Sequence, residues 1–130
     1  QGDSRLLGVA LQTSYVYETD PEIELHFSEN EAGPSGGLML TIAIYDQLVP
    51  EDITKGGKIA GTGTIDYEGK AGPIGGVKYK LAGAVSDGAV IFIVPNGENY
   101  EEAKKLQQEK NYDIEIIGVD TFEDALEKLG

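Results

Sequence analysis

The chain has 130 residues, of which 40% are hydrophobic and 25% charged, and this size and composition are typical of one soluble globular domain. It contains no cysteine, so disulfide bonds and cysteine-based zinc sites are excluded. Its net charge of -13 repels the phosphates of nucleic acids and anionic lipid headgroups, and we expect no nucleic-acid partner.

The first third of the chain is strand-like and ends in a glycine-rich turn. Residues 6–17 are rich in β-branched and aromatic side chains, and residues 22–27 alternate apolar and polar with the period of a half-buried strand. His26, the only histidine, falls on the polar side of that alternation. After the breaker cluster at 33–37, residues 38–48 are apolar on nearly all sides, which predicts a buried helix.

Strands and helices alternate in the rest of the chain. Residues 58–66 and 70–74 flank a turn and predict a β-hairpin, and apolar residues recur at helical spacing from 77 to 85, with Gly88 placed to end that helix. The later predicted elements are a strand over 90–94, a helix capped by Asn99 and ending near Lys110, a strand over 114–119, and a helix over 122–129 capped by Thr121. This order predicts an α+β fold, an α/β sandwich of helices packed on a mixed sheet.

Few of the common catalytic arrangements can be built from these residues. With one histidine and no cysteine, a Ser-His-Asp triad needs His26, and neither a Cys-His pair nor a multi-histidine metal centre can form. The P-loop motif of nucleotide hydrolases does not occur. The Gly-Thr-Gly-Thr run at 61–64 lacks the third glycine of a dinucleotide-binding turn, so we interpret it as a strand close to another backbone. We expect neither a metal nor a nucleotide cofactor.

One turn remains as a candidate site. Ser35 lies in Gly33-Pro34-Ser35-Gly36-Gly37, directly before the predicted buried helix, where unpaired backbone N–H groups point outward. Three roles are open for this serine: the N-cap of the helix, part of an anion cradle, or a nucleophile beside an oxyanion-binding turn.

A nucleophilic serine needs a base, and a buried lysine can supply it when its amine is neutral. Because lysine titrates at about 10.4, its pKa must fall by about 3 for work at neutral pH, which corresponds to roughly 4 kcal/mol. Lys78 and Lys80 both flank the apolar stripe of the helix predicted at 77–85, and periodicity does not choose between them. For each, the alternative is a solvent-exposed lysine whose stem lies along the surface.

Several motifs occur in one order along the chain: Gly-Pro-Ser-Gly-Gly-Leu at 33–38, Ala-Gly-Thr-Gly-Thr at 60–64, Gly-Pro-Ile-Gly-Gly at 72–76 and Val-Pro-Asn at 94–96. Together they resemble the proteolytic domain of the Lon family, and they closely resemble the branch that joins a Lon-type domain to an upstream PDZ domain. The resemblance implies one Lon-like proteolytic domain over residues 1–130.

The resemblance also implies roles for individual residues. The serine of the Gly-Pro-Ser motif is the family's nucleophile and corresponds to Ser35, and the lysine four positions after the paired glycines is its base and corresponds to Lys80. Thr62 corresponds to a supporting threonine near this dyad. The oxyanion-binding turn would comprise Gly33, Pro34 and Gly36. The implied activity is a serine endopeptidase that cleaves protein or peptide substrates without ATP.

The same resemblance implies a cellular setting. Relatives of this architecture are anchored in the cell membrane with the protease on the extracytoplasmic side, and they often form rings, which leaves homo-oligomerisation open. Because the sequence begins at Gln1 and its only methionine is Met39, we expect a longer protein, and the resemblance implies that its upstream part holds an anchor and a PDZ domain, which would provide the only membrane contact. Two positions depart from the family pattern: Gly36 replaces the usual alanine, and Ala32 replaces an acid that is common in ATP-dependent members.

Two other functions stay open at this point. In a binding module, the glycine-rich turn would grip a carboxylate or phosphate, and Lys80 would be charged rather than neutral. In a latent interaction domain, the Ser35 side chain would be turned away from Lys80. The position of the Ser35 hydroxyl relative to the Lys80 amine is the observation that bears most directly on these functions.

Overall fold

A computed structural model describes residues 34–130, so the predictions for residues 6–17 and 22–27, and for His26 and Gly33, lie outside the described residues. At its centre is a three-stranded parallel sheet with the order β1-β4-β5. The strands are β1 (Ile59–Gly61), β4 (Ile91–Pro95) and β5 (Glu115–Val119).

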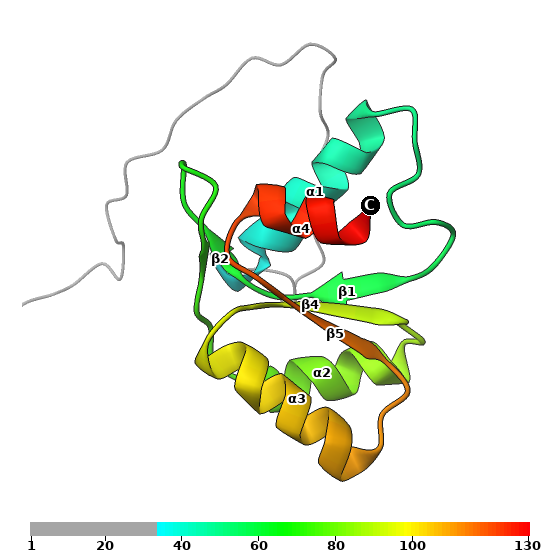
Figure 1. Cartoon of the computed structure of the whole chain (residues 1–130), viewed down its shortest axis with the longest axis vertical. Helices are drawn as coiled ribbons and strands as arrows, with labels where there is room; N and C mark the ends of the chain where they lie inside the picture. The colour runs from blue at the N-terminus through cyan, green and yellow to red at the C-terminus, as the bar shows by residue number, and fades with distance from the viewer. Residues whose placement is uncertain (1–33) are drawn as a thin grey trace, which may run out of the picture.

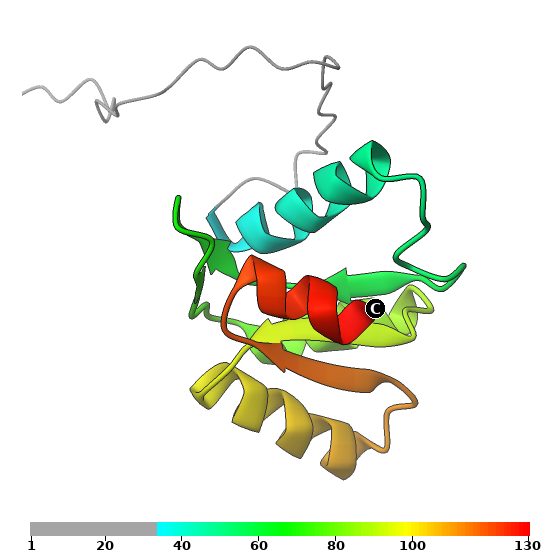
Figure 2. The same cartoon turned by 45° about the horizontal axis from the view of Figure 1, so that its top comes forward.

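Helices cover both faces of this sheet (Figures 1 and 2). On one face lie α2 (Val77–Ser86) and α3 (Glu98–Lys110), and on the other lie α1 (Gly37–Leu48) and α4 (Phe122–Leu129). The connections from β1 to β4 and from β4 to β5 advance across the sheet in the same direction. Because parallel crossovers share one handedness, α2 and α3 fall on the same face.

The core consists of two apolar clusters separated by the sheet. Strand β4 supplies both: Phe92 and Val94 pack with α2 and α3, whereas Ile93 packs with α1 and α4. Successive side chains of a strand point to opposite faces, so a central strand that is buried on both faces must be apolar throughout. The predicted α+β fold is confirmed, since parallel and antiparallel strands both occur beneath packed helices.

The predicted hairpin is present but shorter than expected. Only β2 (Thr64–Ile65) and β3 (Ala71–Gly72) pair antiparallel, whereas β1 pairs with β4 instead. The reason is a close backbone approach: a Cβ added at Gly61 would lie 2.5 Å from the carbonyl oxygen of Ile93. The predicted close approach to another backbone is thus present at Gly61, but residues 61–64 are not one strand, because residues 62 and 63 lie between β1 and β2.

Two helix ends lie where the sequence predicts them. Helix α2 is followed by Gly88 in the left-handed conformation, with φ +82, and the Thr121 hydroxyl caps α4 by accepting from the Asp124 N–H at 2.9 Å. Helix α1 differs from the prediction of burial on nearly all sides. It lies in an outer layer, so Leu38 and Ile42 are buried whereas Leu48 is 49% exposed.

The prediction that Asn99 caps α3 is wrong. This helix begins at Glu98, its N-cap is Gly97, and Asn99 lies inside the first turn with 6% of its surface exposed. Its side chain is instead bonded to the backbone of Ile74, which is distant in sequence and therefore invisible to a local capping rule.

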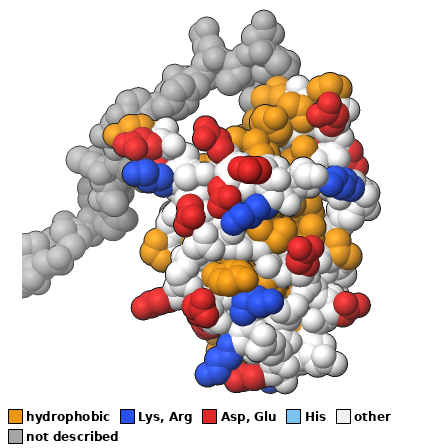
Figure 3. All heavy atoms as spheres, viewed as in Figure 1, with side chains coloured by type: hydrophobic (Ala, Val, Ile, Leu, Met, Phe, Trp, Pro, Cys, Tyr) orange, Lys and Arg blue, Asp and Glu red, His pale blue; other side chains and the backbone are white. Residues whose placement is uncertain are grey.

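Charged side chains lie on the outside of both helical layers. Figure 3 shows acidic and basic groups scattered over one face of the molecule, the arrangement of a solvated surface. Within residues 34–130, no helix combines the length and apolar character that crossing a bilayer requires.

Candidate active site

Ser35 lies in the 3-10 turn Pro34–Gly36, immediately before α1. Its carbonyl oxygen accepts from the Gly63 N–H at 2.9 Å and from the Thr62 hydroxyl at 3.2 Å. The Gly63 carbonyl in turn accepts from the Leu38 N–H at 3.0 Å. These bonds fix the serine turn against the segment that follows β1. The sequence alone assigns no role to Gly63 in holding this turn, although the Gly-Thr-Gly spacing is a signal that could have indicated it.

The hydroxyl of Ser35 is not used to cap the helix. Helix α1 has Gly36 as its N-cap, with no side-chain capping bond. The N-cap interpretation of Ser35 is therefore wrong, because the hydroxyl points to a different partner: it accepts a hydrogen bond from Lys80 Nζ at 2.8 Å.

Lys80 reaches the serine from the first turn of α2. That helix begins after Gly76, whose φ of +75 is the left-handed conformation that glycine adopts without strain. Lys80 is half-buried, and its amine also donates to the Thr62 hydroxyl at 3.3 Å. Lys78 is exposed and makes no such contact. The structure thus separates two lysines that helical periodicity leaves equivalent.

Thr62 joins the serine and the lysine. It follows the end of β1, is only 2% exposed, and its N–H donates to the Ile93 carbonyl oxygen at 2.9 Å. Its hydroxyl contacts both the Ser35 carbonyl oxygen and the Lys80 amine. Three side chains from separate segments therefore meet beyond the carboxyl end of a parallel strand, the usual place for a site in such sheets.

This geometry brings together a hydroxyl and an amine at the separation that proton transfer needs, about 2.6–3.2 Å. The arrangement in which the Ser35 side chain is turned away from Lys80 is contradicted by their 2.8 Å contact. Gly36 and Pro34 lie in the same turn as Ser35, as the sequence predicts. In the described part of the chain, no group of three or more histidine, aspartate or glutamate residues gathers as metal ligands.

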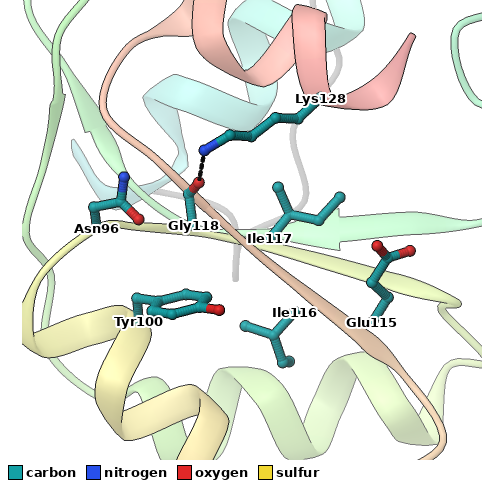
Figure 4. Close-up of a pocket in the computed structure, with 7 residues that line it drawn as sticks. All are labelled: Asn96, Tyr100, Glu115, Ile116, Ile117, Gly118 and Lys128. Atoms are coloured by element: carbon teal, nitrogen blue, oxygen red, sulfur yellow. Dashed lines mark hydrogen bonds between the residues drawn. The ribbon is translucent and has the colours of Figure 1, made fainter.

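A separate cavity of about 430 Å³ lies along β5, at the edge of the sheet opposite β1 (Figure 4). Its lining residues come from β5, from α3, from α4 and from the loop after β4: Asn96, Tyr100, Glu115, Ile116, Ile117, Gly118 and Lys128. The Lys128 amine donates to the Gly118 carbonyl oxygen at 2.7 Å and pairs with Asp124 at 3.2 Å. The cavity shares no residue with the Ser35, Thr62 and Lys80 cluster.

Comparison with known families places this geometry in context. Residues 9–129 match the family described as the Lon protease C-terminal proteolytic domain. The chain belongs to this family. Because Lon proteases are serine peptidases, the meeting of a serine and a lysine has a family precedent here, and the resemblance to the Lon proteolytic domain is confirmed.

Three Lon proteases illustrate the similarity. The Lon protease of Campylobacter jejuni is 36% identical over 83% of this chain and 15% of its own length. Lon protease 2 of Borreliella burgdorferi is 33% identical over 89% of this chain and 15% of its own length. Lon protease 2 of Bacillus subtilis is 32% identical over 92% of this chain and 21% of its own length. This Lon-type chain thus spans only a minor part of the relatives that it matches.

Proposed function

We propose that this Lon-type domain is a serine endopeptidase in which Ser35 is the nucleophile and Lys80 the general base. The observation that carries the proposal is the 2.8 Å hydrogen bond between Lys80 Nζ and Ser35 Oγ. In its neutral form, Lys80 takes the hydroxyl proton while Ser35 Oγ attacks the carbonyl carbon of a peptide bond. Protein or peptide substrates are supported by the relatives, which are named as proteases.

The turn around Ser35 stabilises the negative oxygen of the tetrahedral intermediate through backbone N–H groups. Pro34 has no N–H, so it contributes by holding its own φ near the value that the turn needs. Gly36 follows Ser35 directly and has no side chain, which leaves room for the substrate carbonyl. The Leu38 N–H is already bonded to the Gly63 carbonyl oxygen, so it does not take part.

Lys80 completes the reaction by returning the proton. It protonates the leaving amine as the C–N bond breaks, which leaves an acyl group on Ser35 and a neutral lysine. The same amine then removes a proton from water as the water oxygen attacks the acyl carbon, and it gives that proton to Ser35 Oγ as the ester bond breaks, which releases the second product and restores the serine hydroxyl and the neutral lysine. Thr62 orients the amine through its hydroxyl, which accepts from Lys80 Nζ at 3.3 Å.

We further propose that hydrolysis by this domain uses no nucleotide, because each step above needs only the serine, the lysine, backbone donors and water. The ordered motifs of the sequence support the PDZ-associated branch of the family. On that resemblance rest the proposals of an upstream membrane anchor, an extracytoplasmic location and assembly into a homo-oligomer.

The test compares three variants with the wild type. Ser35→Ala and Lys80→Ala should each lower cleavage of an unfolded, fluorescently labelled protein by about 1000-fold or more, since a nucleophile and its base act as one unit. Lys78→Ala, on the exposed face of the same helix turn, should keep full activity. Circular dichroism checks that each variant is folded.

A second readout covers the case in which the isolated chain cleaves protein slowly. A fluorophosphonate probe should label Ser35 in the wild type, as located by mass spectrometry, and label it far more slowly in Lys80→Ala. Labelling of Lys80→Ala at the wild-type rate would show that Lys80 is not the base.

A further inference from the structure

The loop that leads into α2 sets the position of Lys80. It runs over residues 73–76 between β3 and α2, and Gly75 and Gly76 at its end are both exposed. The Gly76 carbonyl oxygen accepts from the N–H groups of Tyr79 and Lys80, each at 3.1 Å. The loop therefore determines where the first turn of the lysine helix begins. Two consecutive glycines give it much conformational freedom of its own.

The side chain of Asn99, in α3, makes two hydrogen bonds to the backbone of this loop, and we call this pair of bonds the clamp. Its Oδ1 accepts from the Ile74 N–H at 2.8 Å, and its Nδ2 donates to the Ile74 carbonyl oxygen at 2.9 Å. Within residues 34–130, the peptide groups of residues 73–75 have no other hydrogen-bond partner. One buried amide thus does for Ile74 what a neighbouring strand does for a strand residue, because it offers a donor and an acceptor side by side.

We infer that Asn99 is a positioning residue for Lys80. The inference rests on the proposed function, since it concerns the base of that reaction. Helix α2 is also packed through Val77 and Leu81, both fully buried, so the helix persists without the clamp. What the clamp adds is the register of the first turn, and hence the place of the Lys80 amine. A misplacement of about 1 Å in a reacting group can lower the rate by about 100-fold.

The chemistry of the clamp requires an amide. A carboxylate at position 99 keeps an acceptor for the Ile74 N–H but places an oxygen against the Ile74 carbonyl oxygen, whereas alanine loses both bonds. Asn99→Asp and Asn99→Ala therefore break the clamp in two ways, and the aspartate variant preserves the size of the side chain. Either one suffices for the test if the other does not fold.

A matched control lies on the same helix. Gln107 is also an amide whose side chain bonds a backbone carbonyl, that of Ile114, at the end of α3 far from the 73–76 loop. Gln107→Ala should lower the melting temperature, as loss of a partly buried hydrogen bond does, and leave the site unchanged. It separates the effect of a weakened fold from the effect of a released loop.

The experiment uses the whole chain and three measurements: thermal unfolding, amide hydrogen exchange of Ile74 and Lys80, and fluorophosphonate labelling of Ser35 analysed as a binding constant and a maximal rate. For Asn99→Ala we expect faster exchange at Ile74, a maximal labelling rate about 10- to 100-fold lower, and a binding constant within about two-fold of wild type. For Asn99→Asp we expect the same loss of rate. Gln107→Ala should label at the wild-type rate.

Labelling of Ser35 in the variants distinguishes failure of the Asn99 inference from failure of the proposed Lys80 base. If exchange at Ile74 accelerates in Asn99→Ala while Ser35 is labelled at the wild-type rate, the clamp is only structural and the inference is overturned. If Lys80→Ala itself labels at the wild-type rate, the proposed base is wrong, whatever Asn99 does. A slow Lys80→Ala together with slow Asn99 variants and a normal Gln107→Ala supports both.

Discussion

Replacing Thr62 with valine removes one hydroxyl from the site and preserves the shape of the side chain. The hydroxyl donates to the Ser35 carbonyl oxygen at 3.2 Å and accepts from Lys80 Nζ at 3.3 Å. Neither partner is left alone, because the Ser35 carbonyl oxygen keeps the Gly63 N–H at 2.9 Å and Lys80 keeps the Ser35 hydroxyl at 2.8 Å. The valine variant should therefore remain folded and lose mainly the orientation of the lysine.

The size of the effect follows from these distances. Both bonds are at or beyond the long end of the usual range, so each contributes no more than about 1 kcal/mol net. If most of that loss falls on the transition state, where about 1.4 kcal/mol corresponds to tenfold in rate, kcat/KM should fall by about 10-fold. The free energy of unfolding should change by less than about 1 kcal/mol, since valine also buries an additional methyl group.

Thr62→Ser gives the opposite pattern. It keeps the hydroxyl and removes a methyl group from a side chain that is 2% exposed, which costs about 1 kcal/mol of stability. Peptidase assays and urea unfolding on both variants test the reasoning. If the valine variant were as active as wild type while the serine variant lost activity, the methyl group rather than the hydroxyl would support the site, and the role given to Thr62 would be refuted.

Two further predictions concern stability and ionisation. Gly83 lies exposed within α2, and a Cβ added there meets nothing within 4 Å. Gly83→Ala should therefore raise the free energy of unfolding, measured in urea, by about 1 kcal/mol. A variant less stable than the wild type would contradict the helix geometry. Hydrogen bonds from the Thr54 hydroxyl, and then from its N–H, hold the pKa of Asp52 below its usual range. The stabilisation that these bonds give is therefore complete above the pKa of Asp52 in the unfolded chain and is lost as the pH falls through its pKa in the folded chain. Thr54→Val should raise the Asp52 pKa in a carbon NMR titration, and an unchanged value would disprove this cause.

Elements whose limits depend on neighbouring residues were predictable from the sequence. Gly88 ends α2 because only a residue that tolerates a left-handed conformation fits there, and Thr121 begins α4 because its hydroxyl reaches the Asp124 N–H. Both depend on residues within a few positions along the chain, which a local rule can use.

Features that depend on distant partners were not predictable in the same way. Nothing near residues 59–61 indicates that they pair with β4 rather than with the hairpin, and nothing near Asn99 indicates that its partner is Ile74. The choice of Lys80 over Lys78 came from the family resemblance, because both lie beside the apolar stripe. The fold distinguishes the two lysines by their position, since only Lys80 contacts the Ser35 hydroxyl.

The outer edge of β5 affects the self-association of this protein in solution. The Val119 carbonyl oxygen accepts from the Asn96 N–H on the β4 side, so by alternation the peptide groups of Gly118 face outward. Lys128 lays its amine across that edge, on the Gly118 carbonyl oxygen (Figure 4). In the part of the chain that the structure describes, a strand from another molecule must displace this amine before it can pair with Gly118, so Lys128 opposes self-association into fibrils.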